Sequence, residues 1–360
     1  MTGRDAAFAR GLALRTAFED AGAQVVETPI LQPAGLLLDL YGEEIRARAY
    51  VTSDALRGEQ MLRPDFTVPV VQMHMTQGAE PARYTYCGEV FRRQEKDPSR
   101  ANEYCQVGYE VFDRADPAAT DAEVFALISQ IVAPLNLRAA TGDIGILMAA
   151  VHGLKTTDAR KKALLRHIWR PRRFRSLLDR YAGRIAPSKQ RKALIEGASS
   201  HSDAPVIGKR SLAEIDTRIA LLREDAATAP ISAGEVDLLD ALLGVREALP
   251  YALEQLNDLS VDMPSIAGAV GRLERRAEAL AARGVATDAL PFEASYGRTS
   301  MEYYDGFVFG FYSPQRLDLP PIATGGRYDA LTRRLGGGAA IPAVGGVLRP
   351  DLLLEVEGGT

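Results

Sequence analysis

Two stretches of strand-like sequence lie far apart in this chain, and a long segment with helical periodicity separates them. In the first, residues 83–113, the segments RYTYCGEVFR and YCQVGYEVFD are joined by a polar stretch, as in a long-looped antiparallel hairpin. The second begins at residue 291 and reads PFEASYGRTSMEYYDGFVFGFY. Between about residues 155 and 284 the apolar residues follow a helical period that prolines interrupt. This order predicts an α+β fold that is interrupted by a mostly helical insertion.

Shorter patterns predict the remaining elements. Residues 5–22 have the apolar spacing of an amphipathic helix, and residues 120–133 also have helical character. The strand-like segment AQVVETPIL contains Pro29, which lacks the N–H group of a central strand and therefore predicts an edge strand or an interface. We also expect a strand within residues 137–151 and a tight turn at Asp305-Gly306, between aromatic and β-branched runs.

Composition places the chain among ordinary globular proteins. It has 360 residues, of which 46% are hydrophobic and 25% charged, enough for a sizeable core in two or three structural units. Its two cysteines, Cys87 and Cys105, cannot form a disulfide framework, and no metal-ligand or glycine-rich nucleotide-binding motif indicates a cofactor. The charged N-terminus lacks the apolar core of a signal peptide, and no run of about 18 apolar residues occurs. We therefore expect a cytoplasmic protein.

The charge of the chain is unevenly distributed. The net charge is −4, which argues against a surface that is built as a whole to bind nucleic acid. Residues 153–192 nevertheless contain 14 Lys and Arg but only two acidic residues, a local net charge of +12 that leaves −16 for the remainder. This basic segment is either a solvated face of the insertion, a contact for an acidic face of a partner, or a nucleic-acid contact.

The second strand of the predicted hairpin carries one group of candidate binding residues. Gln106, Gly108 and Glu110 alternate and therefore share one face of the strand. An amide and a carboxylate on either side of a glycine can accept hydrogen bonds from an ammonium group while a ligand approaches the backbone. Arg92 ends the facing strand, where its guanidinium can bind a carboxylate or a phosphate. The alternative is that these residues form the solvated face of an ordinary hairpin.

Further candidates lie in three short motifs elsewhere. Asp65 and Thr67 follow a proline in LRPDFT, which suits a turn that presents both side chains on one side, or a simple cap. Of the two adjacent tyrosines that end at Tyr304, only one can line a given pocket, because neighbouring strand residues point to opposite faces. In TGGRYDAL, Arg327 can pair with an anion and Tyr328 provides an aromatic ring.

Six motifs follow one another in a specific order. They are LRPDFT at residue 62, FRRQE at 91, YCQVGYEVF at 104, EYYDG at 302, TGGRYDAL at 324 and PAVGG at 342. This ordered set resembles the catalytic core of the histidyl-tRNA synthetases over nearly the whole chain. The resemblance implies a class II synthetase-like antiparallel sheet flanked by helices, formed by residues 1–152 and 285–360, with a helical insertion at 153–284. In the synthetases an anticodon-binding domain of roughly 100 residues follows this core, and we expect none here, because the sequence stops at Thr360.

The same resemblance assigns roles to individual residues. It matches Gln106 and Glu110 to the residues that hold the amino acid's ammonium group, and Arg92 to the arginine that bridges the carboxylate and the ATP phosphate. It matches Asp65 and Thr67 to a second polar pair beside the ammonium group. Tyr304 and Tyr328 match the aromatic residues around the imidazole, with Arg327 alongside. The implied histidine site consists of Asp65, Thr67, Arg92, Gln106, Glu110, Tyr304, Arg327 and Tyr328.

Several departures from the synthetase pattern affect the predicted function. Thr299 stands where the synthetases carry the arginine that activates the carboxylate, and Arg298 is displaced by one residue. Aspartate replaces glutamate at Asp65. The third motif, PAVGGVLRPDLLLE, lacks its usual ending and leaves Arg349 in the place of the residue that stacks on adenine. A synthetase-like core with eroded activation residues is similar to the regulatory subunits of ATP phosphoribosyltransferase.

This second resemblance implies a chain with no turnover of its own. The short catalytic subunit, which performs the first step of histidine biosynthesis, would need this chain for its activity. Histidine would inhibit the complex by binding to the inherited pocket or to the subunit interface. A homodimer formed through the ETPILQP region, within a larger hetero-oligomer, is the expected assembly. Two alternatives remain: a synthetase-like enzyme that adenylates histidine or a related amino acid, and a binding module that senses histidine or uncharged tRNA.

Overall fold

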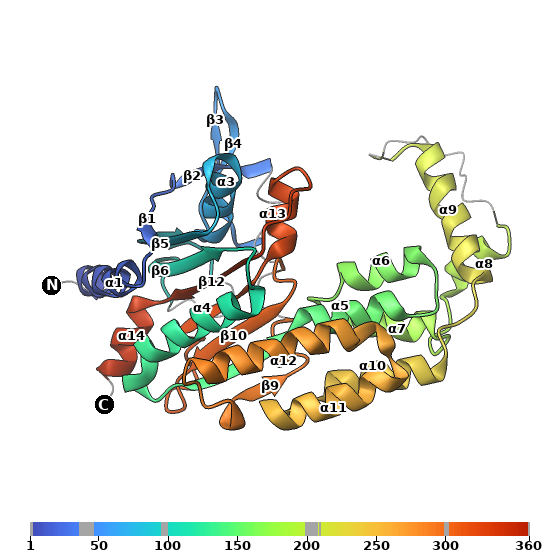
Figure 1. The fold of residues 1–360 in the computed structure, drawn as a ribbon. Coiled ribbons are helices and arrows are strands. Elements are labelled where there is room, and N and C mark those ends of the chain that lie inside the picture. The colour runs from blue at the N-terminus through green and yellow to red at the C-terminus, as the bar shows by residue number, and fades with distance from the viewer. Residues whose placement is uncertain are drawn as a thin grey trace.

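A nine-stranded sheet forms the main layer of the protein (Figure 1). The computed structural model describes residues 3–35, 47–94, 100–198, 208, 210–298 and 302–358. The strand order is β1-β5-β6-β12-β11-β10-β7-β9-β8, in which β1–β5 and β7–β9 are parallel pairs and the other pairs are antiparallel. The strands are β1 (Gln24–Val25), β5 (Ala82–Phe91), β6 (Glu103–Phe112), β7 (Arg138–Asp143), β8 (Arg246–Ala248), β9 (Pro291–Glu293), β10 (Phe307–Tyr312), β11 (Ala323–Arg327) and β12 (Ala343–Leu348).

A second, three-stranded sheet lies beside the main one. Its order is β2-β4-β3, with β2 (Leu31–Pro33), β3 (Val51–Asp54) and β4 (Gly58–Leu62). Both β1 and β2 are edge strands, which confirms the edge position predicted from the proline-containing segment. From β4 the chain passes through Pro64 and Asp65 into α3, so this small sheet positions the LRPDFT motif.

Helices cover both faces of the main sheet (Figure 1). On one face, Tyr109 of β6 stacks on Phe18 of α1 at 5.3 Å, and its hydroxyl donates to Glu123 of α4. On the opposite face, Glu110 meets α3. The helices of this part are α1 (Gly3–Asp20), α3 (Thr67–Gln77), α4 (Pro117–Val132) with the 3-10 turn η1 (Ala133–Leu135), α13 (Asp329–Leu335) and α14 (Pro350–Glu357).

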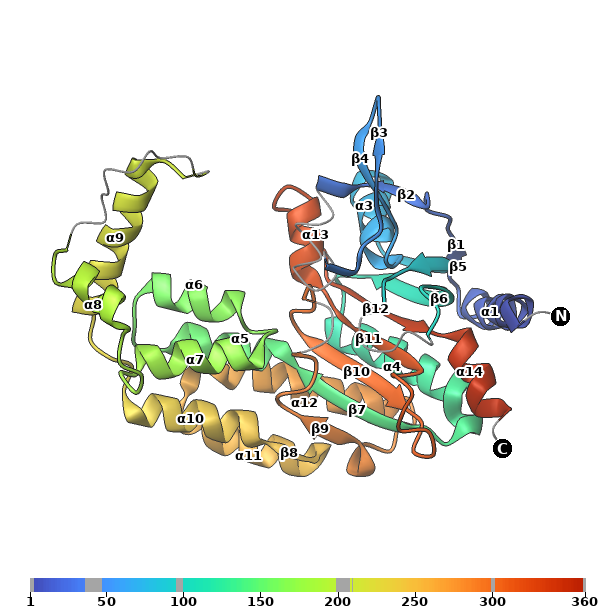
Figure 2. The same ribbon diagram turned by 180° about the vertical axis from the view of Figure 1, so that it is seen from behind.

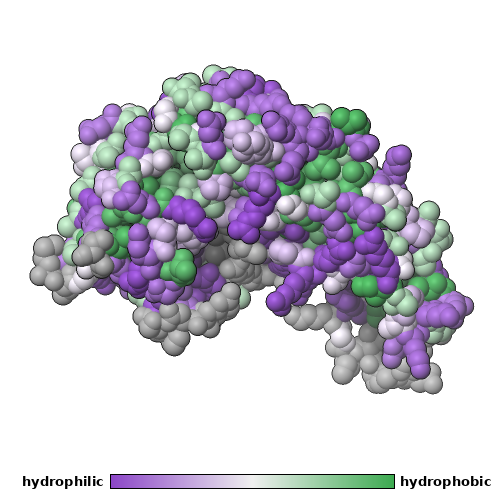
Figure 3. Space-filling view, turned by 90° about the horizontal axis from the view of Figure 1, so that it is seen from below, coloured by the Kyte–Doolittle hydropathy of each residue, from purple (hydrophilic) through white to green (hydrophobic). Residues whose placement is uncertain are grey.

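The apolar composition of α4 reflects its place in the core. Within the described residues, the stretch Pro117–Leu135 is the one helix long and apolar enough to cross a membrane. Its residues Phe125 and Ile128 are fully buried, and Phe125 packs against Phe309 of the sheet at 5.3 Å. Seen from below, hydrophilic side chains cover most of the described surface, and apolar residues lie between them in small groups (Figure 3).

A group of helices extends from one end of the sheet, and α8 with α9 projects furthest from it (Figures 1 and 2). These helices are α5 (Ile144–Gly153), α6 (Asp158–Arg166), α7 (Pro171–Tyr181), α8 (Lys189–Ile195), α9 (Leu212–Ala227), α10 (Ala233–Gly244), α11 (Leu249–Asp262) and α12 (Ala267–Ala282), with the 3-10 turns η2 (Pro264–Ile266) and η3 (Thr287–Ala289). The last of them, α12, returns to the sheet and packs on α4. There Arg276 forms buried ion pairs with Asp121 at 2.9 Å and Asp143 at 2.6 Å.

The structure confirms the predicted hairpin and corrects two other predictions. β5 and β6 pair over their full length, from Ala82↔Phe112 to Phe91↔Glu103. The strand expected within residues 137–151 ends at Asp143, whose carboxylate accepts from the Gly145 N–H and caps α5. A short apolar run does not by itself distinguish a strand from a buried helix, which explains the error.

The second correction concerns the turn that was expected at Asp305-Gly306. Residues 302–304, directly before Asp305, do not form a strand, so this dipeptide does not close a hairpin. The Asp305 carboxylate instead accepts from the backbone N–H groups of Asp329 and Ala330 at 2.9 and 2.7 Å. Asp305 therefore satisfies the free donors at the start of α13.

Candidate functional site

A buried carboxylate, Glu110 of β6, forms the centre of the candidate site. It is 1% exposed and accepts hydrogen bonds from three hydroxyl groups. Thr67 at the start of α3 and Tyr86 of β5 each donate to Oε1 at 2.9 Å, and Tyr328 donates to Oε2 at 2.5 Å. The fold therefore brings together two predicted site residues, Thr67 and Tyr328, around the third.

Two glycines on the same face make room for this cluster. A Cβ at Gly345 of β12, the partner of Glu110 across the strands, would lie 1.5 Å from Glu110 Oε2. A Cβ at Gly108 would lie 2.2 Å from the hydroxyl oxygen of Tyr86. The space above Gly108, which the sequence suggested for a ligand, is thus occupied by Tyr86.

Burial dominates the electrostatics of Glu110. Desolvation raises the pKa of its carboxyl to about 7, although the hydroxyl donors Tyr328, Thr67 and Tyr86 act in the opposite direction and favour the charged form. The pKa values of the Tyr86 and Tyr328 hydroxyls are raised well above their usual range by burial and by the neighbouring carboxylate, so both remain donors. A group with a pKa near 7 in such a cluster is suited to exchange a proton with a bound ligand.

Asp65 and Arg92 form a second polar group next to the first. The Arg92 Nη2 lies 3.9 Å from Asp65 Oδ2, and its Nε donates to the Pro64 carbonyl at 2.6 Å. The Tyr303 hydroxyl donates to Asp65 Oδ2 at 3.4 Å. Asp65 is 3% exposed, so this carboxylate is held by neighbouring side chains and not by solvent.

Gln106 contributes an unused acceptor to the same face of β6. Its side chain is 3% exposed, and its Oε1 is buried with no hydrogen-bond partner among the described residues. Such an acceptor costs free energy unless a donor reaches it. Because the hydroxyl of Tyr86 lies between Gln106 and Glu110, a ligand would meet these two acceptors as separate contacts.

The structure directs Tyr304 and Arg327 to different surroundings. Tyr304 lies on the site face, where a Cβ at Gly326 would be 2.8 Å from its ring. Arg327 points to the other face of the sheet, where its guanidinium pairs with Asp121 at 2.7 Å and Asp329 at 3.0 Å. The fold therefore does not bring the Arg327 side chain to the Glu110 cluster.

The residues that mark departures from the synthetases are engaged elsewhere. Arg298 donates from Nε to the Ile168 carbonyl at 2.8 Å and lies 4.8 Å from the centre of the Phe174 ring, at the base of the extended helices. Burial lowers its pKa to about 10. Arg349 lies 3.9 Å above the Tyr104 ring and pairs with Asp351 at 2.6 Å. Thr299 lies outside the described residues.

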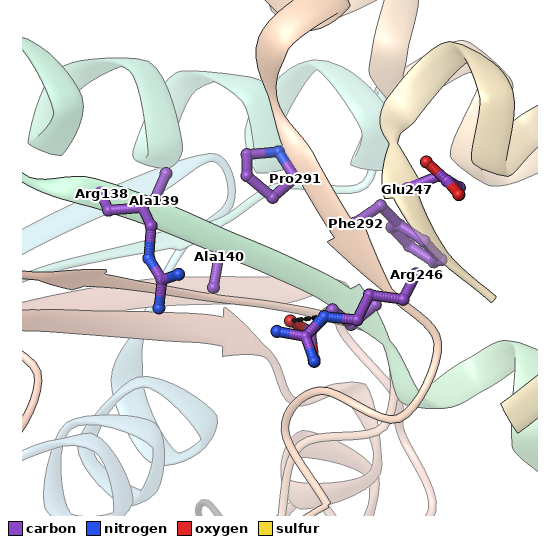
Figure 4. A pocket seen from close by; sticks show the side chains of 8 residues that line it. Arg138, Ala139, Ala140, Arg246, Glu247, Pro291 and Phe292 are labelled. Atoms are coloured by element: carbon purple, nitrogen blue, oxygen red, sulfur yellow. Dashed lines mark ion pairs between the residues drawn. The ribbon is translucent and has the colours of Figure 1, made fainter. Parts of the chain in front are cut away.

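A hollow elsewhere on the surface is separate from this site. It has a volume of about 260 Å³, and Arg138 of β7 and Arg246 of β8 both contribute to its wall (Figure 4). Arg246 pairs with Glu293 at 3.0 Å. Strands β12, β11 and β10 stand between β6 and this end of the sheet, so the hollow is remote from Glu110.

Sequence reasoning missed two site residues, Tyr86 and Tyr303. The register of the hairpin places Tyr86 opposite Gly108, and a large residue facing a glycine on a shared face is a signal that could have identified it. The sequence pattern predicts that only one of the two adjacent tyrosines lines a given pocket, and Tyr304 was the residue selected. Here both rings reach the site, because they leave a turn and not a strand and contact each other at 5.0 Å.

Known proteins resemble this chain over most of its length. The family model of histidyl-tRNA synthetase matches residues 7–217 and 209–353. An ATP phosphoribosyltransferase regulatory subunit from Brucella anthropi is 30% identical over 366 residues, with 96% of each chain covered. The protein of the same name from Brucella ovis is 31% identical over 367 residues, again with 96% of each chain covered.

Solved structures share the fold at lower sequence identity. The structure described as an ATP phosphoribosyltransferase regulatory subunit/histidyl-tRNA synthetase from Bacillus halodurans C has a TM-score of 0.67 at 22% identity, covering 97% of this chain and 79% of its own. The histidyl-tRNA synthetase from Nostoc sp. PCC 7120 has a TM-score of 0.64 at 17% identity, covering 100% and 75%. The class II synthetase-like fold predicted from the motifs is confirmed.

Proposed function

The chain belongs to the histidyl-tRNA synthetase family, among the ATP phosphoribosyltransferase regulatory subunits, and we propose that it activates a short catalytic subunit without catalysing a reaction itself. The observation that carries the proposal is the match to these regulatory subunits through nearly the whole of both chains. The catalytic partner would form phosphoribosyl-ATP in the first step of histidine biosynthesis. The assembly would be cytoplasmic and built on a homodimer of this chain.

The surroundings of two arginines support a role without amino-acid activation. Activation needs a cation at the reacting carboxylate and a flat surface for the adenine ring. Arg298 is held by the Ile168 carbonyl and the Phe174 ring, and among the described residues no hydrogen bond or ion pair joins it to the Glu110 cluster. One face of the Arg349 guanidinium is covered by Tyr104, and its charge is paired with Asp351.

We further propose that histidine binds at the Glu110 cluster as the inhibitor of the complex. Glu110 and the unpartnered Oε1 of Gln106 would accept the donors of the amino acid, and Arg92 beside Asp65 would attract its carboxylate. Inhibition requires that histidine binds the active and inactive forms with different affinity. A coupling free energy of about 1–3 kcal/mol would give about 5- to 150-fold regulation.

The test is phosphoribosyl-ATP formation by the short catalytic subunit from the same organism, with and without this chain, over a range of histidine concentrations. We expect activity that depends on the chain and falls with added histidine. Gln106→Ala should shift the inhibition curve to higher histidine concentration, whereas the control Arg246→Ala, in the remote hollow, should not. Activity that is the same with and without the chain would refute the proposal.

A second candidate function is adenylation of histidine or a related amino acid. The observation in its favour is that Arg92, which the resemblance matches to the second-motif arginine of the synthetases, lies 3.9 Å from Asp65. Histidine-dependent exchange of pyrophosphate into ATP tests this function directly. Clear exchange by the chain alone would replace the regulatory proposal in its simple form.

A further inference from the structure

Four basic residues lie on α6 and in the first turn of α7, on either side of the turn that joins these helices, and we call them the basic corner. They are Lys162, Arg166, Arg172 and Arg173. All four are exposed, and among the described residues none of them has a hydrogen bond or an ion pair through its charged group. Lys162 and Arg166 are four residues apart on α6 and so share one face of that helix.

Other arginines of the same basic segment are paired within the chain. Arg160 forms an ion pair with Asp225 at 2.6 Å, and Arg184 reaches Asp237 at 3.4 Å. Arg175 pairs with Asp240. Eight basic residues of the segment form no ion pair among the described residues, and the basic corner holds four of them; the others are Lys155, Lys161, Arg180 and Lys189.

The position of two of these arginines is unfavourable for the fold itself. Arg172 and Arg173 lie in the first turn of α7, at the positive end of the helix dipole. This turn contains no acidic residue, and the N-cap residue Arg170 makes no side-chain capping bond. The charges of these two arginines are therefore repelled by the helix dipole, and a negatively charged group from outside the chain would offset this repulsion.

The turn that joins the two helices of the corner contacts the segment that carries the site tyrosines. In the turn between α6 and α7, the Trp169 Nε1 donates to the Tyr304 carbonyl at 3.3 Å. Arg170 pairs with Glu302 at 3.1 Å across the same junction. A partner bound at the basic corner would thus lie next to residues whose side chains reach Asp65 and the Glu110 cluster.

We propose that the basic corner is the docking surface for an acidic face of the catalytic subunit. This inference rests on the proposed function and names the surface through which that partner is held. Complementary charge would orient the two subunits and accelerate their association, in a manner that depends on salt. The contact would place the partner against the Trp169 turn, from which the 302–304 segment leads to the histidine site.

Two observations favour a protein partner over a nucleic acid. Single-stranded nucleic acids bind basic surfaces that also offer free aromatic rings for stacking. Trp169 is half-buried and its indole N–H is bonded to Tyr304. Phe174, which follows Arg173 in α7, is buried beneath the Arg298 guanidinium. The aromatic rings near the corner are therefore engaged in packing.

The experiment compares the wild-type chain with the double variant Arg172→Glu/Arg173→Glu in binding to the catalytic subunit by analytical ultracentrifugation. Acidic residues in the first turn of α7 are favourable for the helix, so the variant should melt at the same temperature or higher. We expect the dissociation constant to rise at least tenfold near 0.1 M salt and the difference to shrink towards 1 M salt. The matched control Lys189→Glu/Lys192→Glu makes the same charge change on α8 and should bind within about twofold of wild type.

Each other outcome has a definite meaning. A corner variant that binds the catalytic subunit like wild type overturns the inference, while the proposed function stands because the wild type still assembles. Loss of tRNA binding with unchanged subunit assembly overturns it in favour of a nucleic-acid surface. If the corner variant, measured without the catalytic subunit, has a lower assembly mass than the wild-type chain, the inference is overturned in favour of self-association through this surface. Failure of the wild type to bind or activate the catalytic subunit instead refutes the proposed function.

Discussion

Replacing Glu110 by glutamine should change how the stability of the protein depends on pH. The Glu110 carboxylate is buried and accepts from Thr67, Tyr86 and Tyr328. Glutamine has nearly the same shape, and hydroxyl groups can rotate to accept from its amide, so that the hydrogen bonds can be kept. The substitution therefore removes the ionisation of Glu110 with little change in packing.

The size of the effect follows from the pKa of Glu110. Burial raises this pKa from 4.5 to about 7, so between these values the folded protein holds a proton that the unfolded chain has lost. Ionisation of Glu110 consequently lowers the free energy of unfolding of the wild type as the pH rises through this window. With about 1.36 kcal/mol for each pKa unit, the loss is about 3 kcal/mol well above pH 7, and most of it accumulates between about pH 5 and about pH 8.5.

Urea unfolding of the wild type and of Glu110→Gln across this pH range measures the difference. The variant should gain about 2–3 kcal/mol relative to wild type from low to high pH. Asp305, whose pKa burial also raises to about 7, is present in both proteins and cancels. Glu123→Gln is a control for which the difference from wild type should change with pH in the opposite direction. Burial acts to raise the pKa of Glu123, but hydrogen bonds from Arg83 and Tyr109 outweigh it and hold this pKa below its usual value. A difference between wild type and Glu110→Gln that does not change with pH would refute the reasoning.

Three further predictions concern the framework of the site. Arg276→Met should lower the free energy of unfolding by about 3–5 kcal/mol in a urea titration, because it leaves the buried Asp143 without its partner. Gly345→Ala should lower it by about 1–3 kcal/mol or more and weaken histidine binding measured by calorimetry, since the new Cβ would lie 1.5 Å from Glu110 Oε2. Asp116→Ala should cost about 1 kcal/mol, seen as a lower melting temperature, because the Asp116 side chain caps α4 by accepting from two backbone N–H groups.

The parts of the fold that follow local patterns were predictable from the sequence. Alternating residues in two adjacent segments defined the β5–β6 hairpin, and its register then places Gln106 and Glu110 on one face. The LRPDFT motif gained its meaning only from the fold, which brings Thr67 to Glu110 although 43 residues separate them. The orientation of Arg327 was not predictable, because its partner Asp121 lies 206 residues away and no local pattern records that pairing.

The strand predicted within residues 137–151 was wrong after Asp143, where a helix begins, and the reason is a different one. A run of apolar residues fits a buried strand and a buried helix equally well, and the cap at Asp143 decides between them. Tyr86 was missed because the glycine opposite it was interpreted as space for a ligand. In both cases a short polar contact, and not the hydrophobic pattern, determined the local structure.

Regulation through the Glu110 cluster requires that ligand binding changes something that the partner can sense. The Tyr303 hydroxyl is bonded to Asp65, and the next residue, Tyr304, accepts through its carbonyl from Trp169 of the α6–α7 turn. A ligand that displaces the Tyr303 contact would act on this turn through a single intervening peptide unit. If histidine left the 302–304 segment unchanged in both forms of the complex, its affinity for the two forms would be equal and it could not inhibit by this route. Because Trp169 is the single tryptophan of the chain, a change in its fluorescence when histidine binds to the isolated chain would report this displacement directly, and an unchanged signal at saturating histidine would exclude it.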